Sequence, residues 1–191
     1  MQKSISKQFN IPFNVKYVLR DKDGNIKPIF QENRLFVWLM KKAILSPHAP
    51  KIPFLLGTWQ TAKSLSNLVV SAGKAGAASR INGAGAEAVF TYIALGTGTN
   101  AAAAGDTALQ TESSTNGLSR ANSTASRVTT SVTNDTAQLQ NTFSVTGTVA
   151  VTESGVLNAA STGTLLARQV FSAINVVNGD SLQITWKFQM S

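Results

Sequence analysis

The stretch Leu182-Gln183-Ile184-Thr185-Trp186-Lys187-Phe188 decides the fold of this chain. Apolar residues alternate with polar ones throughout it, and a period of two puts the two sets on opposite faces of a β-strand. Such a strand has one buried face and one solvated face, which is typical of an antiparallel sheet. We therefore expect the fold to be completed by tying this strand into a sheet near the end of the chain.

Similar short runs precede it along residues 87–191, and no proline interrupts them. Residues 89–95 predict a strand, and two alternating runs around Thr133-Asn134-Asp135 predict a β-hairpin. Three more predicted strands, separated by Gly and Asn turns, cover residues 149–151, 155–157 and 165–171 and lead to the strand at residues 182–188. Many short strands at this spacing indicate a mainly β fold, either an antiparallel β-sandwich or a small barrel.

The first part of the chain has a different organisation. Residues 1–12 show no clear period and are interpreted as an arm, whereas residues 13–20 and 26–30 alternate around the turn sequence Asp21-Lys22-Asp23-Gly24-Asn25 and predict a hairpin. Helical spacing predicts two short helices, over residues 33–45 and 61–80. We expect three regions: a docking module over residues 1–60, a helix with a Gly/Ala linker over 61–86, and the β-domain over 87–191.

Charge is distributed unevenly along the 191 residues, whose net charge is +8. Residues 1–80 hold thirteen Lys/Arg against three Asp/Glu, while residues 81–191 hold four against six. All five prolines lie before residue 54. The basic residues are interleaved with apolar ones, which favours docking on an acidic protein partner over binding to nucleic acid.

The sequence lacks the residue patterns of common catalytic and metal sites. There is no cysteine and one histidine, His48, which lies in a Pro-rich loop. The turn at Asp21 resembles the start of a calcium loop, but Pro28 and Phe30 occupy two expected ligand positions. Gly96-x-Gly98 has no third glycine at dinucleotide spacing, and no acid pair supports glycan cleavage. We expect no enzyme, no cofactor and no metal site.

Two further expectations concern location and stability. No run approaches the length of a membrane span, and the start of the chain lacks the apolar stretch of a signal peptide, so we expect a soluble protein made in a cytoplasm. The β-domain contains few charged residues. We predict that at least one Arg–carboxylate pair among Glu112, Glu153, Arg120, Arg127 and Arg168 is structural.

Aromatic side chains in the basic part are candidate anchors for a partner, because buried aromatics dominate interface energy. Two lysines at the end of the predicted first helix join them. The candidate interface residues are Phe9, Phe13, Tyr17, Phe36, Trp38, Lys41, Lys42 and Trp59. The alternative, that Tyr17, Phe36 and Trp38 pack under the β-domain, is equally compatible with the sequence.

Five segments, in this order, resemble a family of small β-rich structural proteins of tailed bacteriophages. The resemblance covers about residues 65–190 and includes Phe90-Thr91-Tyr92-Ile93-Ala94-Leu95-Gly96-Thr97-Gly98-Thr99 and Leu165-Leu166-Ala167-Arg168-Gln169-Val170-Phe171. The other three segments are residues 67–73, 106–112 and 151–158.

The resemblance implies a virion component without enzymatic activity, made in the cytoplasm of a bacterial host. Its expected partners are itself, as a trimer or hexamer, and other virion structural proteins. We expect a tail- or neck-associated protein. A capsid decoration protein and a nucleic-acid-binding protein remain as alternatives.

Overall fold

The computed structural model describes residues 13–32, 57–66 and 68–190. The arm predicted over residues 1–12, the helix predicted over residues 33–45 and His48 lie outside these residues. The elements are β1 (Phe13–Arg20), β2 (Ile26–Lys27), β3 (Ile29–Glu32), β4 (Gly57–Gln60), β5 (Lys63–Ser66), β6 (Leu68–Val69), α3 (Ser71–Asn82), β7 (Tyr92–Gly96), β8 (Ala121–Asn122), β9 (Thr124–Val128), β10 (Thr136–Ser144), β11 (Val149–Leu157), β12 (Leu165–Val176) and β13 (Ser181–Gln189).

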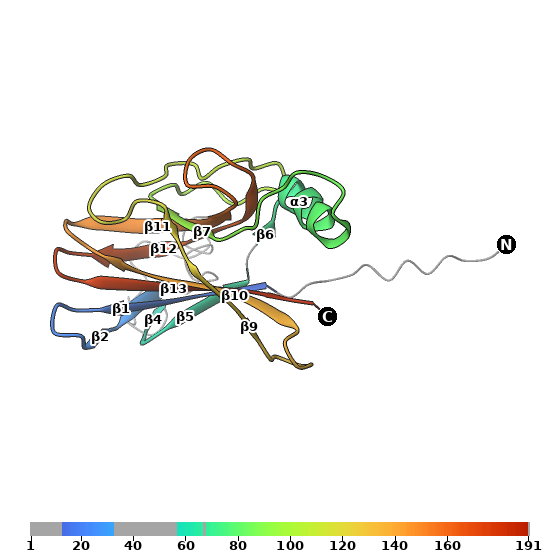
Figure 1. The fold of residues 1–191 in the computed structure, drawn as a ribbon. Helices are drawn as coiled ribbons and strands as arrows, with labels where there is room; N and C mark the ends of the chain where they lie inside the picture. Colours follow the sequence, from blue (N-terminus) through green and yellow to red (C-terminus); the bar gives the residue numbers. More distant parts are fainter. Residues whose placement is uncertain (1–12, 33–56, 67, 191) are drawn as a thin grey trace, which may run out of the picture.

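The described part of the chain is mainly β, with antiparallel sheets and one helix. The larger sheet has the strand order β2-β1-β13-β10-β9, with β5 also paired to β1. The smaller sheet has the order β6-β12-β11-β7-β8, and β3 pairs with β4 in a separate two-stranded ribbon. The larger and smaller sheets lie one over the other, with α3 at one end of the smaller sheet (Figure 1).

The predicted closing strand is confirmed as β13, which lies between β1 and β10 in the larger sheet. Leu182, Ile184 and Trp186 are fully buried, in agreement with the alternation of the sequence. The indole Nε1 of Trp186 donates a hydrogen bond to Ser154 Oγ of β11 at 3.2 Å. This bond links the two sheets through their shared core, where an unpaired indole N–H would be costly.

Both predicted hairpins are confirmed in part. Of the second predicted strand of the first hairpin, residues 26–30, only Ile26 and Lys27 pair with β1, whereas Ile29 and Phe30 pair with β4. In the second hairpin, residues 129–132 lie outside the strands, because β9 ends at Val128. The first joins β1 to β2, and Asp21 Oδ1 accepts hydrogen bonds from the backbone N–H groups of Asp23 and Asn25, both at 2.9 Å. The second joins β9 to β10. The first hairpin is not separate from the β-domain, because β1 pairs with β13 along its whole length, from Phe13↔Phe188 to Arg20↔Ser181. The larger sheet therefore contains strands from both sides of the boundary predicted at residue 60.

The helix predicted over residues 61–80 begins ten residues too early. Residues 63–66 pair with β1 as β5, and residues 68–69 pair with β12 as β6, so tertiary pairing overrides the helical spacing of Leu65, Leu68 and Val69. The helix α3 begins at Ser71, and its buried residues are Gly73 and Gly76. These glycines let the helix backbone lie close to its neighbours, because a Cβ at Gly73 would overlap the carbonyl oxygen of Leu166 on β12.

The strands predicted over residues 149–151 and 155–157 form a single strand, β11. The polar residues between them, Thr152, Glu153 and Ser154, are buried within the strand. Their alternation is interrupted by a register shift relative to β12 between Val151 and Glu153. The sequence prediction was wrong here because it took a polar run for a break, whereas each of these side chains has a hydrogen-bond partner.

Two hydrophobic clusters stabilise the described fold. The main core includes Trp186, Ile184 and Tyr17 of the larger sheet together with Phe171 and Ile174 of the smaller one. A second cluster packs against the smaller sheet under α3 and the segment that contains Leu109. Its buried members are Val70, Ala94, Leu109, Leu157 and Leu165. The smaller sheet is therefore packed on both of its faces.

Candidate interaction surface

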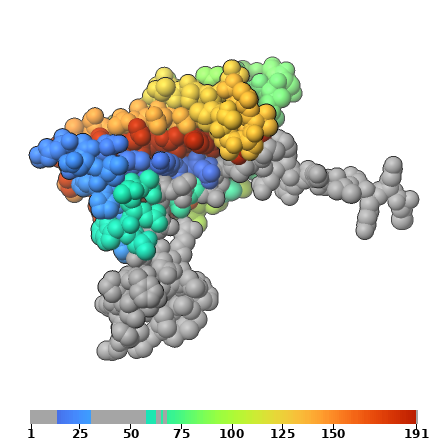
Figure 2. Space-filling view, turned by 90° about the horizontal axis from the view of Figure 1, so that it is seen from below, coloured from blue at the N-terminus to red at the C-terminus, as the bar shows by residue number. Residues whose placement is uncertain are grey.

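The outer face of the larger sheet presents mainly polar side chains. Side chains on this face alternate with the core residues of β1, β9, β10 and β13. They are Asn14, Lys16, Val18, Arg20, Thr124, Ser126, Gln138, Gln140, Thr142, Ser144, Gln183, Thr185, Lys187 and Gln189. In Figure 2 the strands β1 (blue) and β13 (red) lie side by side on this face, which we call the polar face.

The polar face carries cations and no carboxylate among these residues. Lys16, Arg20 and Lys187 are exposed. The register pairs Lys16 with Thr185 and Asn14 with Lys187, so the two lysines are diagonal neighbours on adjacent strands. No described carboxylate lies within ion-pair distance of either lysine. A surface with one sign of charge attracts an anionic partner and steers its approach.

A buried ion-pair network lies on the smaller sheet. Arg168 of β12 donates to Glu153 Oε2 from Nε at 2.8 Å and to Asp106 Oδ2 from Nη1 at 2.9 Å. Glu153 also accepts backbone N–H bonds from Gly98, Gln110 and Thr111 at 2.7–3.1 Å. The network thus fixes the segment between β7 and β8 onto the smaller sheet, and both Glu153 oxygens are fully engaged.

The same network shifts the pKa values of two of its members. Burial raises the pKa of Asp106, but the hydrogen bonds from the Ala103 N–H and from Arg168 outweigh this effect, so the pKa of Asp106 is lowered. Burial lowers the pKa of Arg168, but its bonds to Asp106 and Glu153 outweigh this effect, so the pKa of Arg168 is raised. Both shifts favour the charged pair, which is the behaviour of a structural ion pair.

A second pair lies nearby and is more exposed. Arg120 makes a bidentate contact with Glu112, with Nε–Oε1 and Nη2–Oε2 distances of 2.8 and 2.7 Å. Together with the Glu153–Arg168 pair, it confirms the prediction of a structural Arg–carboxylate pair. Arg127, by contrast, is exposed on β9.

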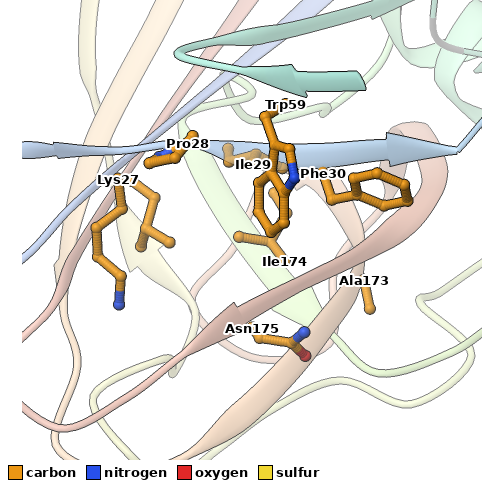
Figure 3. Close-up of a pocket in the computed structure, with 9 residues that line it drawn as sticks. Lys27, Pro28, Ile29, Phe30, Trp59, Ala173, Ile174 and Asn175 are labelled. Carbon is orange, nitrogen blue, oxygen red and sulfur yellow. The ribbon is translucent and has the colours of Figure 1, made fainter. Parts of the chain in front are cut away.

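An apolar pocket lies where the β3–β4 ribbon meets β12 (Figure 3). Its volume is about 230 Å³, and its lining includes the buried side chains of Leu19, Ile29 and Ile174. Trp59 stands over the pocket beside Phe30, with 5.2 Å between the ring centroids. Trp59 is 68% exposed, which is high for a tryptophan.

The structure places the predicted interface residues differently. Trp59 is on the surface, whereas Tyr17 is fully buried with its ring 4.3 Å from that of Phe171, so Tyr17 is a core residue and not a surface anchor. Phe13 is the first residue of β1. The remaining candidates lie outside the described residues: Phe9, Phe36, Trp38, Lys41 and Lys42.

The sequence does not predict that the cations of the polar face lie together. Lys16 and Lys187 belong to alternating runs that were assigned correctly, so the side of the sheet they occupy was predictable. What the sequence did not contain was the pairing of β1 with β13, which places residues 16 and 187 next to each other although most of the chain separates them.

The described residues contain neither a metal-binding cluster nor a membrane-spanning helix. No group of three or more His, Asp or Glu side chains there could hold a metal ion. No helix in the same part of the chain is long and apolar enough to cross a membrane. In the turn that resembles a calcium loop, the carboxylate of Asp21 accepts hydrogen bonds from the backbone N–H groups of Asp23 and Asn25, as in an Asx-turn.

No protein-family model, curated protein or solved structure matches this chain.

Proposed function

We propose that this chain is a non-enzymatic structural protein of a tailed-bacteriophage virion. In this proposal it self-associates through its β-domain and docks on another virion protein, most readily at the tail or neck. The two stacked sheets form a β-sandwich, which presents one polar face to a partner. The order of the five segments that resemble small phage structural proteins supports the virion assignment.

The observation that carries the docking part of the proposal is the polar face. It presents Lys16, Arg20 and Lys187 without a carboxylate among them, on a sheet whose other face is packed. Such a face fits an acidic protein surface, because complementary charge steers two proteins together and selects among partners. The exposed Trp59 offers a separate apolar contact where the β3–β4 ribbon meets β12.

Copy number in purified particles tests the proposal. Quantitative mass spectrometry should find this chain in virions of the phage that encodes it, at a small fraction of the copy number of the major capsid protein. A copy number comparable with that of the capsid protein would instead assign the chain to capsid decoration. Absence from purified particles would overturn the virion role.

The charge of the polar face also permits a test against nucleic-acid binding. Phosphate contacts depend steeply on salt and not on sequence. We expect no retention of duplex DNA at physiological salt by the purified protein. Retention that is lost in a Lys16→Gln and Lys187→Gln variant would favour the nucleic-acid alternative over docking on a protein.

A further inference from the structure

The strand β9 forms one edge of the larger sheet and has a free side. It pairs with β10 from Thr136↔Val128 to Gln140↔Thr124, and no described strand lies on its other side. Thr124, Ala125, Ser126 and Arg127 are all exposed. Figure 1 shows β9 at the margin of the molecule, away from the packed centre of the sheet.

The other edges of the two sheets are shorter or already occupied. On the opposite side of the larger sheet, β5 and β2 both pair with β1. The edge strands of the smaller sheet, β6 and β8, have two residues each. Proteins usually protect a long edge with charged side chains, proline or a bulge, and β9 has no proline, lysine or bulge. Its single charge is Arg127.

We propose that β9 pairs with β9 of a second copy of this chain, antiparallel and around a two-fold axis at Ser126. Thr124 then faces Val128 of the second copy, and Ala125 faces Arg127. A two-fold contact requires a surface that is complementary to itself, and this register meets that condition. A register centred on Arg127 would place the two arginines directly opposite each other, which is destabilising.

This inference rests on the self-association part of the proposed function and adds a two-fold axis to it. A hexamer with dihedral symmetry contains such an axis, whereas a trimer with only a three-fold axis does not. A contact of five residue pairs is small, so we expect association that depends on concentration. At the contact, the two larger sheets become one continuous sheet.

The test uses the charge opposite Arg127. Ala125→Glu places a carboxylate opposite Arg127 of the second copy, twice in each dimer, and Ala125→Lys places a like charge there. We expect the dimer dissociation constant of the full chain to fall roughly 5-fold for Ala125→Glu and to rise by a similar factor for Ala125→Lys. Sedimentation equilibrium over a concentration series measures both.

Ala150 provides the matched control, because it is an exposed alanine on β11, a strand of the smaller sheet. Ala150→Glu and Ala150→Lys should leave the dissociation constant unchanged. Raising the salt concentration should remove the difference between the two Ala125 variants, since salt screens exposed charges. A monomer at all concentrations, or a dimer that responds alike to both Ala125 variants, would overturn the inference.

These outcomes are separate from those for the virion role. A protein that is present in particles but never pairs through β9 contradicts only the edge contact. A protein that dimerises in the predicted charge-dependent way but is absent from particles contradicts only the virion assignment.

Discussion

Arg168 is the cation that pairs with the buried carboxylate of Glu153 in the smaller sheet. Its side chain is 3% exposed and its partner Glu153 is fully buried. Replacing one member of such a pair leaves the other charged and buried without compensation, which costs far more than the pair contributes when it is intact. The carboxylate of Glu153 would keep its three backbone donors but lose its cation.

We therefore expect Arg168→Ala to lower the free energy of unfolding by about 3–5 kcal/mol, measured by urea denaturation. The exposed Lys74 on α3 is the control, and Lys74→Ala should change the same quantity by no more than about 0.5 kcal/mol. The double variant Arg168→Met with Glu153→Gln removes both charges and should recover part of the loss. Equal effects of Arg168→Ala and Lys74→Ala would contradict a structural role for the pair.

Tyr17 leads to a prediction of the opposite sign. It is fully buried against Phe171, and its hydroxyl has no hydrogen-bond partner in the structure. Burial without a partner for the ionised form raises the pKa of this hydroxyl. A buried hydroxyl that makes no bond loses its hydration without replacement, so removing it costs nothing in hydrogen bonding.

Tyr17→Phe should therefore raise the free energy of unfolding, by about 1 kcal/mol, and should leave self-association unchanged. Urea denaturation and sedimentation measure the two quantities. Tyr17→Ala is the control for packing, because it opens a cavity in the core and should destabilise by about 3–5 kcal/mol. A loss of stability in Tyr17→Phe would show that the hydroxyl has a partner in solution.

At the scale of elements, the contact between α3 and β12 depends on the absence of a side chain at Gly73. A glycine inside a helix normally destabilises it, so Gly→Ala in an open helix position gains about 0.5–1 kcal/mol. At Gly73 the added methyl would meet backbone atoms of Leu166, which cannot move aside without shifting the strand. The steric effect therefore outweighs helix propensity.

Gly73→Ala should lower the free energy of unfolding by about 1–3 kcal/mol, measured by thermal or urea unfolding. Gly105 is the control, because a Cβ there would have no neighbour within 4 Å and its backbone does not need the left-handed region. Gly105→Ala should be close to neutral. An equal and small effect at both positions would mean that α3 does not pack on β12 as described.

The elements that the sequence predicted correctly are those with strict alternation. β13 and β1 each bury one set of alternating side chains, so their pattern is sufficient to assign them. The errors have a common cause, which is that burial of polar or small residues depends on distant partners. Glu153 is fully buried because Arg168 and three backbone N–H groups surround it, and Gly73 is a contact because β12 lies against it.

The candidate surface was predictable only in part for the same reason. The exposure of Trp59 agrees with its proposed role as an anchor, but Tyr17 is buried in the core. The face that a strand buries depends on which sheet it joins. For β1, the buried face is the one that pairing with β13, at the other end of the described chain, turns toward the core.

At the scale of the whole molecule, the described start and end of the chain lie together in one sheet. β1 and β13 are adjacent strands, and Val15, Tyr17 and Leu19 belong to the main core together with residues of β10, β11 and β12. Contacts between such distant parts form late, because the chain must close a long loop before it gains them. We expect folding of the β-domain to require the first hairpin.

A fragment that contains only residues 61–191 tests this dependence. Without residues 1–60, the fragment lacks three core side chains of β1, Val15, Tyr17 and Leu19, and one of β3, Ile29, and one edge of β13 has no partner. An unpaired strand next to an incomplete core favours aggregation over folding. We therefore expect the fragment to show no cooperative thermal transition by circular dichroism, whereas the full chain does.

A synthetic peptide of residues 13–32 should restore the transition, because it carries both strands of the first hairpin and all four missing core residues. If the fragment alone unfolds cooperatively at the temperature of the full chain, residues 1–60 are a separate module after all, and the pairing of β1 with β13 contributes little to stability.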